Sequence, residues 1–197
     1  MNRLIYAVVA IFSIAATVPP GAVWTSFSNP SFEDSAPREN KFPQGWQSKT
    51  PDNTPDLFPG AWGLTLTPHH GKTCLGLVTR DDGGVENVGQ SLPKPLQAGD
   101  CYAFSVYLAH ADSYVGFNKP CRLRVWGGNA PGDKQVLLAT SPLIAHSQWK
   151  AYTFQFTAPQ NIQSITFEAY FAPGASFKYK GNILLDQCSD IEKCVKA

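Results

Sequence analysis

The sequence predicts an all-β protein, an antiparallel β-sandwich of the jelly-roll type. Apolar and polar residues alternate with a period of two along many short segments, the pattern of strands that bury one face. Gly and Pro, 16 of each, cluster between these segments, where they favour tight turns. No segment combines a sustained 3.6-residue apolar period with helix caps, so a helical body is not expected.

In the segments with the clearest alternation, the pattern fixes which face of the strand is buried. Tyr102, Phe104, Val106 and Leu108 share one face of a strand over residues 101–109, and that face is expected in the core. Similar alternation predicts strands over residues 122–126, 151–157 and 164–171. Weaker strands are expected at residues 62–67, 73–78, 85–91, 136–139 and 182–186.

Composition and charge narrow the function classes. Apolar residues make up 43% of the 197-residue chain, which is enough for a core of ordinary size. Only 16% of residues are charged, against about 25% in typical soluble domains, which argues against disorder and coiled coils. The formal net charge of +1 provides no overall basic field for nucleic acid.

The first 22 residues read as a secretory signal peptide, followed by a single domain over residues 23–197. Arg3 precedes an apolar, Ala-rich run over residues 4–18, and small residues follow it, as in cleavable signals. The run is short for a membrane span, although an N-terminal anchor helix is the alternative. We therefore expect a secreted, periplasmic or cell-surface protein whose mature chain has no membrane span.

Export would make the five cysteines candidates for disulfides. Because their number is odd, at least one is left free or bonded to another chain. Cys188 and Cys194 are close enough in the sequence to form a local bridge, but the connectivity stays open.

A family resemblance is carried by motifs spread over nearly the whole mature chain. It begins with Asn29-Pro30-Ser31-Phe32-Glu33, and the chain later contains Gly45-Trp46. Gly71-Lys72-Thr73-Cys74-Leu75 and a Gly99-Asp100-Cys101-Tyr102 strand start follow, and a strand ending in Asp186 comes last. This order resembles the galactose-binding-like jelly roll of carbohydrate-binding modules, in the version found in exported Bacteroidetes proteins. The resemblance constrains the architecture more strongly than the activity.

Two carboxylates at opposite ends of the chain suggest a structural cation site. Glu33 ends the opening motif and Asp186 ends the last hydrophobic strand, and the first and last strands of such a sandwich lie together. Buried carboxylates repel one another unless a cation such as Ca²⁺ joins them. The resemblance implies this calcium site, with main-chain carbonyls near Ser31 or Lys72 as further ligands. The alternative is that Glu33 accepts backbone N–H groups while Asp186 faces water.

One outward sheet face is the candidate ligand surface. If the strands concerned are neighbours, aromatic rings and charged groups share this face, and sugars need that combination. The alternative is that the same residues only pair across strands. The residues are Tyr107, Arg122, Arg124, Trp126, Glu168 and Tyr170. A second candidate surface is a loop rim with Trp46, Asp56, Trp62, His69 and His70.

Catalytic patterns are weak. The four histidines, His69, His70, His110 and His146, occur in no zinc or nucleophile motif. A glycosidase needs two carboxylates across a cleft, and Glu86 and Glu168 are the candidates in this sequence. Both occur in strand contexts, where a surface role is commoner. We therefore expect no enzyme activity.

These observations predict a secreted, non-catalytic module that binds a polysaccharide or cell-surface glycan, with calcium as a structural ion. The alternative is a structural or interaction module whose partner is a cell-envelope protein. A jelly-roll hydrolase or lyase acting on glycans is the third class.

Overall fold

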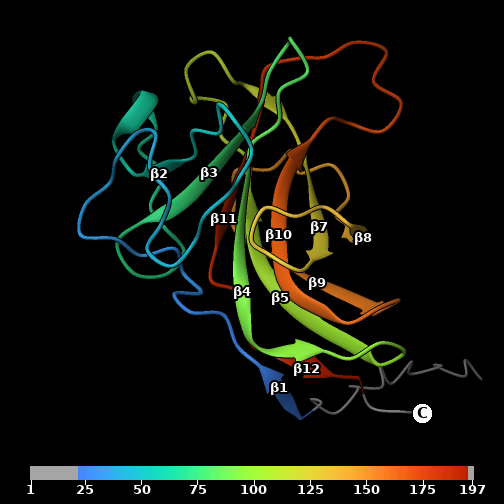
Figure 1. The fold of residues 1–197 in the computed structure, drawn as a ribbon. Coiled ribbons are helices and arrows are strands. Elements are labelled where there is room, and N and C mark those ends of the chain that lie inside the picture. Colours follow the sequence, from blue (N-terminus) through green and yellow to red (C-terminus); the bar gives the residue numbers. More distant parts are fainter. Residues whose placement is uncertain (1–21, 195–197) are drawn as a thin grey trace, which may run out of the picture.

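Two antiparallel sheets pack face to face in the computed structural model, which describes residues 22–194 (Figure 1). The larger sheet contains β1 (Val23–Thr25), β2 (Asp56–Phe58), β3 (Cys74–Thr79), β5 (Cys101–Ala109), β6 (Lys119–Pro120), β9 (Lys150–Thr157), β11 (Gly181–Asp186) and β12 (Ile191–Lys193). The smaller sheet contains β4 (Asn87–Leu96), β7 (Arg122–Gly128), β8 (Val136–Thr140) and β10 (Ile162–Tyr170). The predicted fold class is confirmed.

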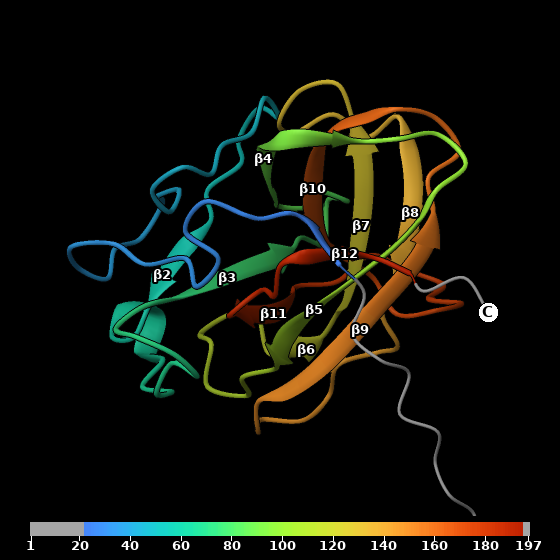
Figure 2. The same ribbon diagram turned by 90° about the horizontal axis from the view of Figure 1, so that it is seen from below.

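The strand order brings distant segments together. The smaller sheet runs β4-β10-β7-β8, and the larger runs β1-β12-β5-β11-β3-β2, with β9 beside β5 and β6 beside β11. Every pairing is antiparallel except that of β6 with β11. Because β1 pairs with β12, the first and last strands of the described chain are neighbours, as Figure 2 shows from below.

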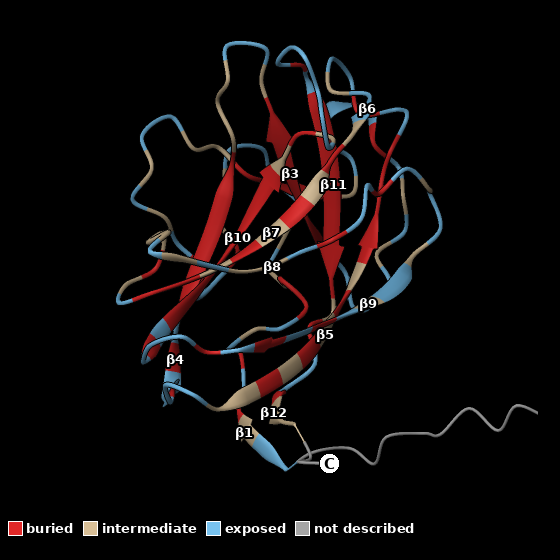
Figure 3. Cartoon of the chain, turned by 90° about the vertical axis from the view of Figure 1, so that its right-hand side faces the viewer, coloured by how far each residue is buried: buried red, intermediate tan, exposed pale blue. Residues whose placement is uncertain are grey.

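Alternation explains the main core. Tyr102, Phe104, Val106 and Leu108 of β5 are all buried, while the residues between them are partly exposed. They face Phe167 and other inward residues of the smaller sheet. Figure 3 shows this buried interior between the two layers. Burying each large apolar side chain contributes about 1.5–3 kcal/mol.

A second, smaller core covers the outer face of the larger sheet. Cys74 and Val78 of β3 and Leu184 of β11 point outward and pack against Leu64 and Tyr114 from the loops. Every residue of β3 and β11 is therefore buried, which a strand with one solvent face would not show.

One expected strand is wrong. Residues 62–67 form no strand, and a short 3-10 turn, η1 (Ala61–Gly63), lies there instead. Trp62 and Gly63 both have positive φ, 49° and 72°, and this left-handed backbone cannot continue a strand. Leu64 and Leu66 follow and join the second core, which accounts for the apolar alternation.

The cysteines pair differently from the local bridge considered above. Cys101 at the start of β5 is bonded to Cys194, with a sequence separation of 93. Cys188 is buried and free, as are Cys74 and Cys121. The predicted signal peptide, residues 1–22, lies almost wholly outside the described residues. Within residues 22–194, no helix has the length and apolar character that crossing a membrane requires.

Two loops lie over part of the outer face of the smaller sheet. Ser48 and Asn53, in the loop of residues 47–53, hydrogen-bond Asn87 of β4. The loop of residues 129–135 reaches β10, where the Gly132 N–H donates to Thr166 Oγ1 at 3.0 Å. This cover explains why Thr166 and Glu168 are buried although they point away from the core. The part of the face toward the start of β7 carries the candidate site.

Candidate functional site

The outer face of β7 and β10 brings together five of the six residues predicted to bind a ligand. In the antiparallel register, Arg122 lies opposite Tyr170, Arg124 opposite Glu168, and Trp126 opposite Thr166. The alternation of both strands turns these side chains away from the core while Leu123 and Val125 point into it. We call the four partly exposed residues Arg122, Arg124, Trp126 and Tyr170 the β7–β10 strip.

Glu168 lies beneath the strip and holds Trp126 in place. The Trp126 indole Nε1 donates to Glu168 Oε2 at 2.8 Å, and the Lys134 ammonium pairs with Glu168 Oε1. Glu168 is only 3% exposed, so it is a support of the surface and not part of its exposed area. The indole ring is thereby fixed in orientation before any ligand arrives.

Arg124 is stacked, but its hydrogen-bonding capacity is unused. Its guanidinium carbon lies 3.1 Å from the ring centroid of Tyr170 and 5.8 Å from that of Trp126, which is cation–π geometry. Arg124 Nε is buried and has no hydrogen-bond partner among residues 22–194. Leaving a buried donor unsatisfied costs about 1–3 kcal/mol, so this arginine has a capacity that the chain itself does not fill.

Tyr107 is the predicted strip residue that the structure places elsewhere. It lies on β5, opposite Asp186 of β11, on the outer face of the larger sheet. The two outer faces of a sandwich point in opposite directions, so Tyr107 cannot join Trp126 in one surface. Its ring instead stacks on His69, with centroids 3.6 Å apart.

The two carboxylates predicted to hold a cation accept backbone N–H groups from the same short loop, residues 70–73. The Glu33 carboxylate accepts the Lys72 N–H at 3.0 Å and the Thr73 N–H at 3.4 Å. It is seated directly on Gly71, where an added Cβ would lie 2.0 Å from Glu33 Oε1. Asp186 is fully buried, and its oxygens accept N–H groups of His70 and Gln187 at 2.9 and 2.7 Å.

The charge of this pair is not neutralised by the protein. Within the described residues, neither Glu33 nor Asp186 forms an ion pair with a basic side chain. Burial, with a contribution from repulsion by Glu33, raises the pKa of Asp186 to about 6, despite the hydrogen bonds that oppose this change. Glu33 thus accepts backbone N–H groups as the alternative expected, but Asp186 does not face water. Ser31 is buried beside Phe32, and Lys72 supplies an N–H to Glu33.

The residues proposed for the loop rim separate into different environments. Trp46 is buried in the main core, stacked on Phe27 and Phe167, so it plugs the sandwich. Trp62 stays 38% exposed. Together with Asp56 it borders a cavity of about 260 Å³, which Glu86 and Arg80 also line. Sequence reasoning placed Asp56 and Trp62 on one loop rim but did not bring Glu86 to them, because Glu86 comes from a separate part of the chain.

This acidic pocket satisfies its own carboxylates. Glu86 pairs with Arg80 at 2.5 Å and accepts the Thr54 hydroxyl and the Val78 N–H. Burial raises the pKa of Glu86 to about 7. Asp56 accepts the Asn40 N–H and the hydroxyl of Tyr114, and burial raises its pKa as well.

The other titratable side chains considered for catalysis are buried or contact neighbouring residues. His110 is buried and lies between Asp112 and the Asn182 carbonyl. His146 contacts the Gln148 carbonyl and the Tyr152 hydroxyl. Burial raises the pKa of Cys121 to about 12, which disfavours a reactive thiolate. Among residues 22–194, no group of three or more His, Cys, Asp or Glu is arranged to hold a metal.

Comparisons with known proteins bear on the fold. The sequence matches no protein-family model and no curated protein. Its structure is similar to a cyclase from Fischerella sp. TAU, with a TM-score of 0.59 at 14% identity, covering 88% of this chain and 98% of the cyclase. It is also similar to the CBM22-1 xylan-binding domain of Paenibacillus barcinonensis Xyn10C, with a TM-score of 0.51 at 18% identity over 90% and 98% of the two chains.

The chain has the jelly-roll fold of carbohydrate-binding modules. A third similar structure is the K3 cleaved adhesin domain of Lys-gingipain from Porphyromonas gingivalis W83, with a TM-score of 0.51, 14% identity, and coverage of 86% and 96%. The same jelly roll thus carries a cyclase, a xylan-binding domain and an adhesin domain. Function must therefore be argued from this chain's own side chains.

Proposed function

We propose that the protein is a secreted, non-catalytic module that binds glycans on the β7–β10 strip. One observation carries this proposal: the Arg124 guanidinium lies over the ring of Tyr170, beside an indole that Glu168 holds in place. A surface that is oriented in advance loses little side-chain entropy on binding. The carbohydrate-binding module among the similar structures supports the proposal.

The chemistry of the strip suits a sugar chain. The apolar C–H faces of pyranose rings stack on aromatic rings, and Trp126 and Tyr170 offer two such rings on adjacent strands. Guanidinium groups supply several N–H donors in a fixed plane, which suits the dense acceptors of a glycan. At about 3.3 Å per residue, Arg122 to Trp126 spans roughly 13 Å, enough for more than one sugar unit.

The absence of catalysis is part of the proposal and rests on how the carboxylates are used. Glu168 is committed to Trp126 and Lys134, and Glu86 to Arg80. A glycosidase needs one carboxyl free to donate a proton and another free to attack or to activate water. Neither glutamate is free for such a role.

We also propose that Ca²⁺ joins Glu33 and Asp186. Asp186 is buried and Glu33 is partly buried, and within residues 22–194 neither forms an ion pair with a basic side chain. Glu33 contributes to raising the pKa of Asp186, and its carboxylate rests on Gly71, which leaves room for it. Calcium prefers carboxylate and carbonyl oxygens, and main-chain carbonyls near Ser31 and Lys72 would complete the ligand set. The ion would stabilise the rim and take no part in chemistry.

The alternative partner is a cell-envelope protein. Its support is the adhesin domain that shares this fold. A protein partner would favour a large apolar patch, whereas the strip is aromatic and cationic. The composition of the strip therefore fits glycan binding better than binding of a protein partner.

The test is affinity electrophoresis on a panel of polysaccharides with wild type, Trp126→Ala and Tyr170→Ala. We expect each substitution to weaken binding about tenfold or more, because stacked aromatic side chains dominate binding energy. Trp149→Ala is the matched control: Trp149 is partly exposed and its indole donates one hydrogen bond, to the Thr67 carbonyl, away from the strip. Equal retardation of all four proteins would reject the strip, and no retardation of wild type by any polysaccharide would reject glycan binding.

A further inference from the structure

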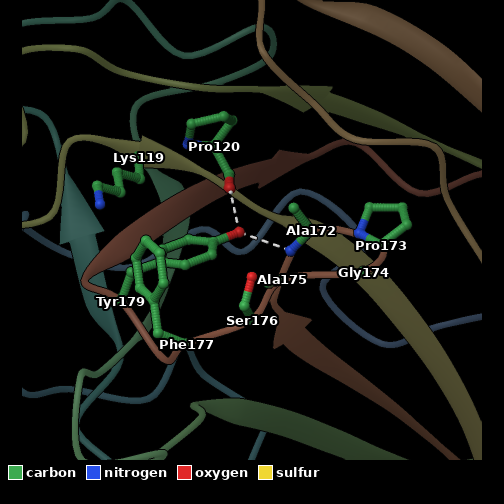
Figure 4. A pocket seen from close by; sticks show the side chains of 9 residues that line it. All are labelled: Lys119, Pro120, Ala172, Pro173, Gly174, Ala175, Ser176, Phe177 and Tyr179. Atoms are coloured by element: carbon green, nitrogen blue, oxygen red, sulfur yellow. Dashed lines mark hydrogen bonds between the residues drawn. The ribbon is translucent and has the colours of Figure 1, made fainter.

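A pocket lies at one end of the β7–β10 strip. Its cavity of about 320 Å³ is lined by the β10–β11 loop and by the chain that leads into β7, as Figure 4 shows. Phe177, at 66% exposed, and Tyr179 lie next to each other on one wall, and Lys119 and Pro120 form another. The sequence marks this loop only as a Pro-Gly turn, although the run Phe177-Lys178-Tyr179-Lys180 alternates rings and cations.

Arg122 and Phe171 connect the strip to the pocket through direct contacts. Arg122 Nε donates to the Phe171 carbonyl at 3.0 Å, and Ala172 of the pocket follows directly. The Phe171 ring packs edge-on against both Tyr170 of the strip and Tyr179 of the pocket, with centroids 5.5 and 5.2 Å apart. Phe171 is only 3% exposed, so these ring contacts join the strip and the pocket beneath the surface.

Four cations along this path have no carboxylate partner. Within the described residues, Lys119, Arg122, Arg124 and Lys178 form no ion pair, whereas the nearby Lys134 is paired with Glu168. The two unpaired lysines lie over rings instead: Lys119 near Phe177 at 5.2 Å and Lys178 over Phe171 at 4.6 Å. In a chain of net charge +1, this is a local concentration of positive charge.

The acceptors that a neutral sugar would need are already used. Both oxygens of Glu168 are occupied, by Trp126 and Lys134. The Tyr179 hydroxyl accepts from the Ala172 N–H and donates to the Pro120 carbonyl, as the dashed lines in Figure 4 mark. Neutral hydroxyl groups both donate and accept hydrogen bonds, whereas Lys and Arg side chains only donate, and this surface carries mainly Lys and Arg.

From this excess of cations and donors we infer that the glycan bound here is anionic, with carboxylate or sulfate groups along its chain. The guanidinium groups of Arg124 and Arg122 bind those groups, the rings of the strip stack on the sugars, and one charged unit enters the pocket beside Lys119 and Phe177. Arginine pairs with such planar or multi-oxygen anions through two parallel N–H bonds. This inference deepens the proposed function and rests on it.

The experiment compares matched polymers by affinity electrophoresis and isothermal titration calorimetry. Polygalacturonate is paired with its methyl ester for the carboxylate arm, and dextran sulfate with dextran for the sulfate arm. We expect at least about tenfold tighter binding to one or both charged members, as hydrogen bonds to charged groups imply, and weaker binding as salt rises. Equal affinity for charged and neutral members would overturn the inference while leaving glycan binding intact. Binding of none of the four would overturn the inference together with the proposed function on which it rests.

Substitutions test which side chains bind the charged polymer. Arg124→Ala and Phe177→Ala are each expected to lose binding to the charged polymer by about tenfold, since hydrogen bonds and ring contacts are both lost. Arg124→Lys is expected not to restore it, because an ammonium lacks the planar fork. Lys150→Ala removes one exposed cation of β9, away from the strip, and is expected to bind like wild type; an equal loss there would mean unspecific charge attraction and overturn the inference.

A final experiment compares the charged polysaccharide with another polyanion, single-stranded DNA. Single-stranded DNA carries phosphate charges without pyranose stacking surfaces. DNA binding as tight as that of the charged polysaccharide, and equally sensitive to Arg124→Ala, would overturn the glycan assignment in favour of a general polyanion surface. Phe177 is largely exposed, so unchanged thermal unfolding of Phe177→Ala serves as the folding control.

Discussion

The β7–β10 strip and the acidic pocket of Asp56 and Glu86 contain similar chemical groups in opposite states. Both combine an arginine, a buried glutamate and a partly exposed tryptophan. In the pocket, Arg80 is paired with Glu86, and the oxygens of both carboxylates accept hydrogen bonds from neighbouring residues. In the strip, within the described part of the chain, Arg124 forms no ion pair with a carboxylate and its Nε has no hydrogen-bond partner.

A stabilising cluster and a binding surface can be distinguished by whether their polar groups are already satisfied within the protein. Groups that satisfy one another inside the protein gain nothing further from a ligand, and removing one of them leaves the others buried and unpaired. Groups left unsatisfied at a surface have capacity for a ligand. We therefore expect changes in the pocket to alter stability and changes in the strip to alter binding.

The largest expected effect is on stability, from Glu86→Ala. Removing this buried carboxylate leaves Arg80, Thr54 and the Val78 N–H without their shared acceptor. We expect the free energy of unfolding to fall by about 3 kcal/mol, measured by urea denaturation, with glycan affinity unchanged below the transition. Asp190→Ala, which removes an exposed carboxylate, is the control. Loss of glycan binding in folded Glu86→Ala would make the pocket the binding site and reverse the comparison.

The Glu33–Asp186 pair lies between these two cases, because its carboxylates accept backbone N–H groups but form no ion pair with a basic side chain in the described part of the chain. Adding Ca²⁺ to protein stripped with EDTA should raise the free energy of unfolding, by about 2.7 kcal/mol when calcium exceeds its dissociation constant a hundredfold. Asp186→Asn should abolish this increase, which thermal unfolding with and without the ion measures. Identical transitions in EDTA and in calcium would remove the structural ion from the account.

A smaller effect concerns pH. The pKa of Glu86 is raised from 4.5 to about 7 in the folded protein, so folding favours its protonated form. Its contribution to stability is complete below pH 4.5 and is lost as the pH rises through about 7, with a slope of at most about 1.4 kcal/mol per pH unit. Glu86→Gln keeps the shape and should remove this part of the slope in urea titrations at several pH values. A slope that Glu86→Gln leaves unchanged would assign it to other groups, Asp186 among them.

The sequence was sufficient to predict the two sheets and their buried faces, but not the contacts that the loops make. Alternation placed Phe104, Leu123 and Phe167 in the core because a period of two follows directly from strand geometry. It also placed Trp126 and Tyr170 on one outer face. It could not place Tyr107, because alternation within a strand does not say to which sheet the strand belongs.

Alternation could not predict structural features that depend on loops and on the pairing of distant strands. The residues from Trp62 alternate like a strand, but a left-handed backbone at Trp62 and Gly63 folds them over the larger sheet. Lys134 reaches Glu168 from a loop that the sequence marks only as a turn. Cys101 and Cys194 are joined by sheet topology across most of the described chain, and no spacing rule would have paired them.

The most direct test of the central claim is a two-dimensional NMR titration of isotope-labelled protein with oligogalacturonate, monitoring indole and arginine side-chain N–H signals. The β7–β10 strip is the binding surface in this account, so the Trp126 Nε1–H and Arg124 Nε–H signals should shift with ligand concentration, while those of Trp62 and Trp149 stay in place. A shift of the Trp62 signal with Trp126 and Arg124 unmoved would contradict the account and assign binding to the acidic pocket.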